Sequence, residues 1–375
     1  MQEVKNGINS LYSVLDGFTK PLVVCDGSFP YLSIKYTIEH LGVFFVLFDG
    51  FTPNPLFEQI CKGVDLFLSE GCDSMIAVGG GSAIDVAKCI KLAVLAKEGK
   101  KAIIPPLVSQ RLPIDGGKIP FIAIPTTAGT GSESTHNAVM YYEGAKQTVT
   151  NDGILPDFAI LEPTVLKTLP LYQKKCTMMD ALCQGIESWW SVNSTDESKE
   201  YSRKTVELIM ANWRKYIFEN DDDAAAQIML AANYSGRAIN IAQTTAAHAM
   251  SYKITSMYGL PHGHAVAVCL PEIWHQMLSA DECIDKRGLG YVQSVFKEIA
   301  NSMDCLTPED AIILFREMID SMDLENPVPM GDYQTEIELL ASSVNQIRLK
   351  NNPVPLDYGI VSGLYRRIVQ IHSSL

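Results

Sequence analysis

The chain has 375 residues, 47% of them hydrophobic and 19% charged, a balance typical of globular proteins and a length that suits two domains. It has 30 Lys and Arg against 43 Asp and Glu, and the net charge of -13 disfavours binding to nucleic acids and anionic membranes. There is no apolar run of roughly 18 residues that would span a bilayer, no signal-peptide pattern and no CxxC pair among nine cysteines. We therefore expect a cytoplasmic protein with reduced thiols.

The first half of the chain alternates short apolar runs with stretches of helical periodicity. Five runs are expected to form strands: 21–25, 43–48, 74–78, 121–124 and 158–161. The segments 55–70 and 83–98 between them have the periodicity of amphipathic helices. Because continuous apolar strands that alternate with helices are covered on both faces, we predict a parallel sheet.

The second half is predicted to be almost entirely helical. The expected helices span residues 178–191, 196–218, 222–240, 245–258, 284–304, 307–322 and 333–346. We place the boundary near residue 165, which gives an α/β domain, 1–165, and an all-helical domain, 166–375. A cleft between the two would be the natural place for a site.

A glycine-rich stretch follows the expected strand 74–78. Three glycines let the backbone approach a pyrophosphate closely, and the N–H groups of the helix that begins there attract anionic oxygens. The spacing is not GxGxxG, and a tight strand–helix turn is the alternative. The residues that we assign to dinucleotide binding are Gly79, Gly80, Gly81, Ser82 and Asp85.

A second loop, after the run 121–124, is crowded with hydroxyls and glycines. Its Thr126, Thr127, Thr130 and Ser132 offer donors to phosphate and ribose, although a loop that only caps the next element would look similar. Two such loops after two parallel strands favour a nucleotide site more strongly than either loop alone.

Histidines gather in the second half. Four of the seven lie between residues 248 and 275, with His248 in a small-residue helix and His262 in a turn rich in Gly and Pro. Imidazoles placed in this way suit Zn²⁺ or Fe²⁺, whereas a single histidine is more often a core residue.

A carboxylate that fits with these histidines is Asp180. Asp180, Gln184 and Glu187 share one face of the expected helix 178–191, and an aspartate on an apolar helix is costly to bury unless it is paired or coordinated. The alternative is a charge near a helix N-terminus, where the helix dipole stabilises it.

Taken in order, these segments resemble the iron-containing (group III) alcohol dehydrogenase family over nearly the whole chain. The matching motifs are Asp49-Gly50 with Pro53-Asn54-Pro55, Gly79 to Lys88, Pro125 to Glu133, Pro156-Asp157, Asp180-Ala181, His248, Pro261-His262-Gly263 and Asn352-Pro353. The resemblance implies a fold like that of dehydroquinate synthase, a modified Rossmann-type domain followed by a helical one. It also implies hydride transfer between NAD and a small aldehyde or alcohol at a divalent metal, in a homodimer.

The resemblance further implies the metal ligands. Asp180, His248 and His262 match three ligands of the family, and the fourth, normally a histidine, falls on Gln184. An amide oxygen is a poorer ligand for Fe²⁺ or Zn²⁺ than an imidazole, so we expect Gln184 to be a weak or absent ligand. Tyr252 stands where many members have a further histidine, and either Tyr252 or His264 would relay the alkoxide proton.

Within the family, the segments 180–194 and 235–253 look similar to a branch that interconverts phosphonoacetaldehyde and 2-hydroxyethylphosphonate. Arg237 and Lys253 flank the expected ligands and would bind an anionic substrate group, with surface cations at helix ends as the alternative.

The resemblance also bears on the choice of cofactor. Asp26 ends the first strand, where a carboxylate accepts hydrogen bonds from ribose and repels a 2′-phosphate, so we expect NAD, with NADP as the alternative. Lys146 aligns with a family lysine near the cofactor. Three rival functions remain: a general alcohol or diol dehydrogenase, a lyase like dehydroquinate synthase, and a binding protein that has lost its metal.

Overall fold

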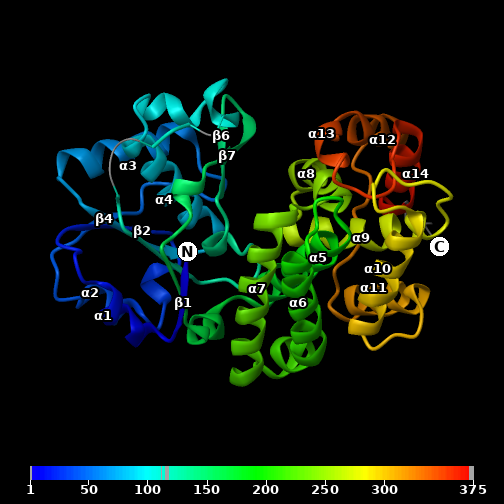
Figure 1. Ribbon diagram of the computed structural model, residues 1–375, viewed down its shortest axis with the longest axis horizontal. Helices are drawn as coiled ribbons and strands as arrows, with labels where there is room; N and C mark the ends of the chain where they lie inside the picture. Colours follow the sequence, from blue (N-terminus) through cyan, green and yellow to red (C-terminus); the bar gives the residue numbers. More distant parts are fainter. Residues whose placement is uncertain (1, 111, 115–117, 371–375) are drawn as a thin grey trace. The chain divides into compact units, whose positions relative to one another are not determined.

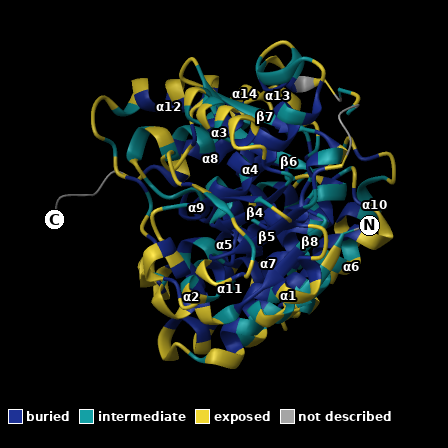
Figure 2. Cartoon of the chain, turned by 90° about the vertical axis from the view of Figure 1, so that its left-hand side faces the viewer, coloured by how far each residue is buried: buried dark blue, intermediate teal, exposed yellow. Residues whose placement is uncertain are grey.

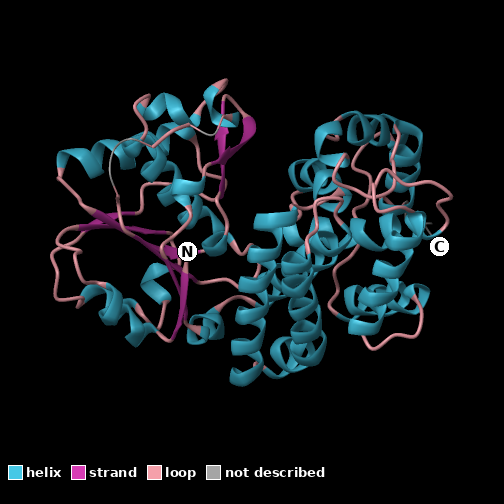
Figure 3. Ribbon diagram, in the orientation of Figure 1, coloured by secondary structure: helices cyan, strands magenta, loops and turns pink. Residues whose placement is uncertain are grey.

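The computed structural model describes residues 2–110, 112–114 and 118–370, and it divides into two compact units. The first unit contains Met1–Leu169 and Asn220–Gly236, and the second contains Pro170–Glu219 and Arg237–Leu375. A parallel sheet forms the first unit and helices form the second, so the predicted fold class is confirmed (Figure 3). No helix within the described ranges has the length and hydrophobicity needed to cross a membrane.

Six parallel strands form the sheet of the first unit (Figure 1). Their order across the sheet is β1-β8-β5-β4-β2-β3. Their bounds are β1 Glu3–Asn6, β2 Pro21–Cys25, β3 Val46–Phe48, β4 Ser74–Gly79, β5 Phe121–Pro125 and β8 Phe158–Leu161. Every residue of β2, β4 and β5 is buried, which explains why these runs are continuously apolar instead of alternating.

The other elements of the first unit include the two predicted helices and several that the sequence pattern did not predict. Their bounds are α1 Leu11–Val14, α2 Lys35–Glu39, α3 Phe57–Ser69, α4 Gly81–Leu95, β6 Asn137–Tyr142 and β7 Ala145–Thr150. β6 and β7 form an antiparallel hairpin. Although Ala138 to Tyr142 is apolar in sequence, only two residues of β6 and one of β7 are buried, so the hairpin lacks the continuous burial of the parallel strands.

The second unit is built from helices. Their bounds are α5 Leu171–Trp190, α6 Asp196–Arg214, α8 Ala246–Tyr258, α9 His262–Leu278, α10 Leu289–Ser302, α11 Pro308–Ser321, α12 Tyr333–Ser342, α13 Gln346–Leu349 and α14 Tyr358–Ile368. Two of them, α9 and α14, fall outside the predicted helices, and α13 begins at the last residue of the predicted helix 333–346. The expected turn at His262 is wrong, because Pro261 is the N-cap of α9 and His262 is its first residue.

The helix α5 forms the core of the second unit. It packs against α6 and α9, and every residue from Met178 to Trp190 is buried (Figure 2). The ring of Trp190 makes edge-to-face contacts with Trp274 and Phe296, at centroid distances of 5.6 and 5.8 Å. Polar groups on α5 are therefore held in a closely packed, water-poor interior, where an unneutralised charge is costly.

The helix α7, Asp222–Ala242, belongs to the first unit as far as Gly236. A Cβ added to Gly236 would lie 2.4 Å from the carbonyl oxygen of Gly131, so the two backbones are in contact. Asn233 of the same helix donates to Glu133 Oε1 at 3.0 Å and to Ser134 Oγ at 2.7 Å. The chain thus returns to the first unit over Asn220–Gly236. A single boundary near residue 165 does not describe this return, because the return depends on contacts between segments that are distant in the sequence.

Candidate active site

The two predicted nucleotide loops begin side by side, at the carboxyl ends of the neighbouring strands β4 and β5. Gly79 of β4 pairs with Pro125 of β5, and each loop starts there. Gly79 has no room for a side chain, because a Cβ would lie 2.6 Å from Asp26 Oδ2. Gly80 is the N-cap of α4 and Ser82 lies in its first turn, so free backbone N–H groups of this helix form a ready anion site.

The second loop lies directly against the first. Thr126 donates its N–H to the carbonyl oxygen of Gly79 at 3.0 Å. A Cβ on Gly80 would lie 3.5 Å from Thr127 Cγ2, and one on Gly81 would lie 3.0 Å from Thr130 Cγ2. The structure thus brings the predicted glycines and threonines together in a single surface that can bind an anionic ligand.

Behind this surface a buried lysine joins the loops. Lys88 of α4 donates to the carbonyl oxygen of Asn137 at 2.7 Å, to Ser132 Oγ at 3.1 Å and to the carbonyl oxygen of Ser132. Ser132 in turn donates to Asp85 Oδ1 at 2.7 Å. Burial lowers the pKa of Lys88 to about 8, and it raises the pKa of Asp85 although the charges of Lys88 and Lys146 oppose that shift. Asp85 and Ser132 therefore stabilise the loops, and their direct contact with a cofactor stays a prediction.

The carboxylate of Asp26 is fixed beside the first loop. Its Oδ2 accepts the N–H of Gly80 at 3.0 Å, and its Oδ1 accepts the N–H of Ser28 at 2.9 Å. We expect Asp26→Gly to shift the preference from NAD toward NADP by about tenfold or more in the ratio of kcat/KM, because a negative charge that repels a 2′-phosphate is lost. Steady-state kinetics with both cofactors measure this. Asp26→Asn, which removes the charge while keeping a side-chain oxygen, should move the ratio in the same direction, and an unchanged ratio in both variants would refute the assignment.

Three donor side chains converge in the helical unit. Asp180 of α5, His248 of α8 and His262 of α9 place their ligand atoms within 4.8 Å of one another. His248 Nε2 lies 3.3 Å and His262 Nε2 lies 4.0 Å from Asp180 Oδ1. Asp180 and His248 are buried, whereas the side chain of His262 is 36% exposed, so the group is accessible from the His262 side.

Gly263 allows the helix that carries His262 to approach α5. A Cβ on Gly263 would lie 2.0 Å from the carbonyl oxygen of Cys176 and 2.9 Å from Asp180 Cβ. Because the first obstacle is a helix backbone, no side chain fits at this position. The contact fixes the separation of Asp180 and His262.

Glu187, also on α5, is the outer partner of His248. Its Oε2 bonds His248 Nδ1, and its Oε1 accepts the N–H groups of Thr245 and Ala247 at 3.2 and 2.8 Å. The carboxylate therefore caps the N-terminus of α8 and turns Nε2 of His248 toward Asp180. The sequence placed Glu187 on the face of Asp180 but predicted no role for it, because its partner lies 61 residues further along the chain.

The buried donor group is rich in negative charge. Burial alone would lower the pKa of His248, but the charges of Glu187 and Asp180 outweigh burial and raise the pKa to about 9. His248 Nε2 lies beside Asp180 Oδ1 without the geometry of a hydrogen bond. Two buried carboxylates around one imidazole, with the ring of His262 5.4 Å from that of His248, fit a divalent cation such as Fe²⁺ or Zn²⁺.

Family profiles match nearly the whole chain. The profile for iron-containing alcohol dehydrogenases matches residues 4–163, and the C-terminal profile of the Fe-containing alcohol dehydrogenase family matches residues 175–369. The chain belongs to the iron-containing alcohol dehydrogenase family. Enzymes of this family use NAD and a divalent metal, so the predicted enzyme class and cofactors are confirmed.

Individual proteins are similar to this dehydrogenase in sequence or in fold. Phosphonoacetaldehyde reductase from Streptomyces viridochromogenes is 35% identical over 300 residues, which are 76% of this chain and 73% of that protein. The structure of an iron-containing alcohol dehydrogenase from Thermococcus thioreducens matches with a TM-score of 0.86 at 24% identity, over 98% of both chains. Sulfoacetaldehyde reductase from Bifidobacterium kashiwanohense, solved with NAD⁺, also gives 0.86, at 22% identity over 98% of this chain and 97% of that chain.

Gln184, where the family resemblance predicts the fourth metal ligand, is buried in α5 one turn after Asp180. We expect Gln184→His to tighten metal binding by about tenfold or more, since an imidazole nitrogen replaces an amide oxygen at the usual ligand position. Competition with a chelator of known affinity measures the change, and the thermal midpoint checks that the larger ring is accommodated. A variant that is fully folded yet binds the metal no more tightly would show that position 184 is not a ligand.

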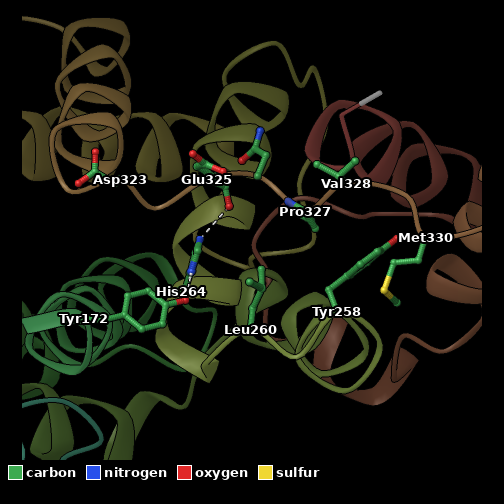
Figure 4. Close-up of a pocket in the computed structure, with 10 residues that line it drawn as sticks. Tyr172, Tyr258, Leu260, His264, Asp323, Glu325, Pro327, Val328 and Met330 are labelled. Carbon is green, nitrogen blue, oxygen red and sulfur yellow. Dashed lines mark hydrogen bonds between the residues drawn. The ribbon is translucent and has the colours of Figure 1, made fainter. Parts of the chain in front are cut away.

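The two predicted proton-relay residues of the dehydrogenase lie in different surroundings. The ring of Tyr252 stacks on that of His262, with centroids 5.6 Å apart and planes at 10°. His264 lines a cavity of about 400 Å³, shown in Figure 4. There its Nε2 donates to the carbonyl oxygen of Glu325 and its Nδ1 accepts from the Tyr172 hydroxyl, both at 2.8 Å. Burial lowers the pKa of His264, which agrees with a neutral ring.

The two predicted substrate-binding cations are half-buried. The Arg237 guanidinium lies over the ring of Tyr201 in α6, 5.7 Å from its centroid. Lys253 lies on α8 one residue after Tyr252, and its ammonium makes no hydrogen bond or ion pair with the residues described here. Their contact with a substrate stays a prediction.

Proposed function

We propose that the enzyme reduces phosphonoacetaldehyde to 2-hydroxyethylphosphonate with NADH. The observation that carries this proposal is the match to phosphonoacetaldehyde reductase over three quarters of the chain, at 35% identity. The nucleotide loops and the donor group of Asp180, His248 and His262 support the hydride transfer. The substrate carbonyl carbon accepts the hydride from nicotinamide C4, its oxygen accepts a proton, and NAD⁺ leaves.

Different residues would hold the metal, orient its ligands and transfer the proton. Asp180, His248 and His262 would hold the metal, which when bound supplies a Lewis acid next to the substrate oxygen. Glu187 keeps His248 oriented through its Nδ1. The half-buried Tyr252, stacked on His262, is placed to hold or pass the proton that the alkoxide needs. His264, the alternative donor, is less suited to this role because both its ring nitrogens are bonded to Tyr172 and Glu325.

Initial rates of NADH oxidation test the proposal directly. Phosphonoacetaldehyde, propanal and glycolaldehyde are compared at matched concentrations, with 2-hydroxyethylphosphonate as the expected product. A higher kcat/KM for phosphonoacetaldehyde supports the proposal. Faster reduction of the uncharged aldehydes would indicate a general alcohol or diol dehydrogenase, and no net NADH oxidation with any of them would favour a lyase or a binding protein. We also propose that the enzyme is a cytoplasmic homodimer, which sedimentation equilibrium tests for the oligomeric state.

The predicted cations give a second test. Replacement of Arg237 or Lys253 by a neutral residue is expected to reduce kcat/KM for phosphonoacetaldehyde by about 10- to 100-fold, the effect of one charge-assisted contact in a desolvated site. Propanal never uses the cation, so its kcat/KM should stay nearly constant. Equal losses on both aldehydes, or none on either, would assign these residues to the helix surface.

A further inference from the structure

A third cation, which the sequence did not single out, contacts the donor group through Tyr252. Arg348 Nη1 donates to the Tyr252 hydroxyl at 2.7 Å, and the guanidinium carbon lies 5.1 Å from the centroid of that ring. Tyr252 in turn contacts the donor group: its ring stacks on that of His262, whose Nε2 lies 4.0 Å from Asp180 Oδ1. One aromatic side chain therefore separates the guanidinium from a predicted metal ligand.

The segment that carries Arg348 is anchored to the same two helices that supply the buried donors. Asn351 accepts at its carbonyl oxygen the N–H of Val192, just beyond the end of α5, at 3.0 Å. Its Nδ2 donates to Gln243 Oε1 at 3.0 Å and to the carbonyl oxygen of Thr244 at 3.2 Å, directly before α8. These bonds fix the backbone next to Arg348 relative to Asp180 and His248.

We propose that Arg348 is a specificity-determining residue that binds the anionic group of the substrate, while the Tyr252 hydroxyl keeps its guanidinium in place. In phosphonoacetaldehyde only one methylene separates the carbonyl carbon from phosphorus, so the charged group must bind close to the metal ligands. A planar guanidinium pairs with two oxygens of a phosphonate at once, a geometry that a lysine does not offer. Arg348 is half-buried, which strengthens such a pair relative to one in bulk water.

This inference rests on the proposed function and specifies which residue recognises the substrate charge. Arg237 lies over the ring of Tyr201, and the ammonium of Lys253 makes no bond within the described part of the chain. Arg348 is the one of these three cations with a hydrogen bond to a residue that contacts His262. It can act together with either of the others on a doubly charged group.

The test compares Arg348→Met, Arg348→Lys and the control Lys350→Met, which removes the same charge from an exposed position two residues away. Each variant is assayed with phosphonoacetaldehyde, succinic semialdehyde and propanal, and inhibition by unreactive ethylphosphonate is measured in parallel. We expect Arg348→Met to lower kcat/KM for the preferred anionic aldehyde by about 10- to 100-fold and to weaken ethylphosphonate inhibition similarly. Propanal should be reduced nearly as before, Arg348→Lys should be intermediate, and Lys350→Met should resemble the wild type.

The outcomes separate this inference from the proposed function. If the wild type prefers succinic semialdehyde and Arg348→Met loses that preference, the phosphonate substrate is wrong but the role of Arg348 stands. If the wild type prefers phosphonoacetaldehyde and Arg348→Met keeps the preference, the role of Arg348 is overturned while the proposed function stands. An equal loss on charged and uncharged aldehydes shows that Arg348 only positions Tyr252, and a wild type that favours no anionic aldehyde overturns both proposals.

Discussion

His262→Ala should release the metal and abolish turnover. His262 is one of three side chains whose ligand atoms lie within 4.8 Å of one another, and the fourth ligand position predicted from the family resemblance falls on Gln184, a weaker donor. Removing a donor from this small set leaves Asp180 and His248 to hold a divalent ion by themselves. Because even outer-shell partners of a metal contribute about 10- to 100-fold to affinity or activity, we expect a loss of more than about 100-fold in kcat.

The measurement combines metal content after dialysis against a chelator with NADH oxidation before and after Fe²⁺ or Zn²⁺ is restored. His275→Ala is the matched control, since His275 lies on the same helix, α9, but is exposed and outside the donor group. The control should keep both metal and activity. Full activity of His262→Ala after chelation would mean that the metal-dependent reaction proposed here is wrong.

Glu187→Gln is expected to weaken metal binding by about 10- to 100-fold, although Glu187 is not itself in the donor group. In the native protein Oε1 accepts N–H groups at the start of α8 while Oε2 bonds His248 Nδ1. A glutamine has a single acceptor oxygen. If that oxygen stays on the helix N-terminus, its NH₂ group faces Nδ1 and favours the tautomer that carries its proton on Nε2, where a metal cannot bind.

Metal affinity of the Glu187 variant is measured by chelator competition, together with the thermal midpoint. The control is Glu272→Gln on α9, which disrupts ion pairs of 2.8 and 2.9 Å to Arg316 and Arg367 outside the donor group. It should lower the midpoint and leave metal affinity unchanged. If Glu187→Gln lowered only the midpoint as well, Glu187 would have a purely structural role as the cap of α8.

The sequence predicts the fold well where burial imposes a continuous pattern. The apolar runs that became β2, β4 and β5 are buried along their whole length, and the glycines after β4 lie where the turn demands them. The hairpin of β6 and β7 and the helix α9 were missed. The hairpin has few fully buried residues, and α9 begins within a Gly- and Pro-rich stretch that also favours a turn.

In the candidate site, too, the sequence predicts the residues that stand out locally and misses those whose role depends on tertiary packing. Asp180, His248 and His262 stand out as residue types that an apolar helical region rarely contains without a reason, and the structure brings them together. The parts of Glu187 and Arg348 depend on tertiary packing. Glu187 bonds a histidine 61 residues away, and Arg348 bonds a tyrosine 96 residues away, separations at which local periodicity carries no information.

The buried ammonium of Lys88 has a consequence for how cofactor use can change in this enzyme. Lys88 lies on α4, the helix that follows the first loop, and its ammonium binds the backbone of the second loop at Ser132 and the start of β6 at Asn137. An ordered pair of loops loses little conformational entropy when a dinucleotide binds, because folding has already fixed the backbone of both loops. The same bonds make the two loops one module for engineering and for evolution. A first loop exchanged for a GxGxxG sequence would keep its new shape only if the second loop were exchanged with it.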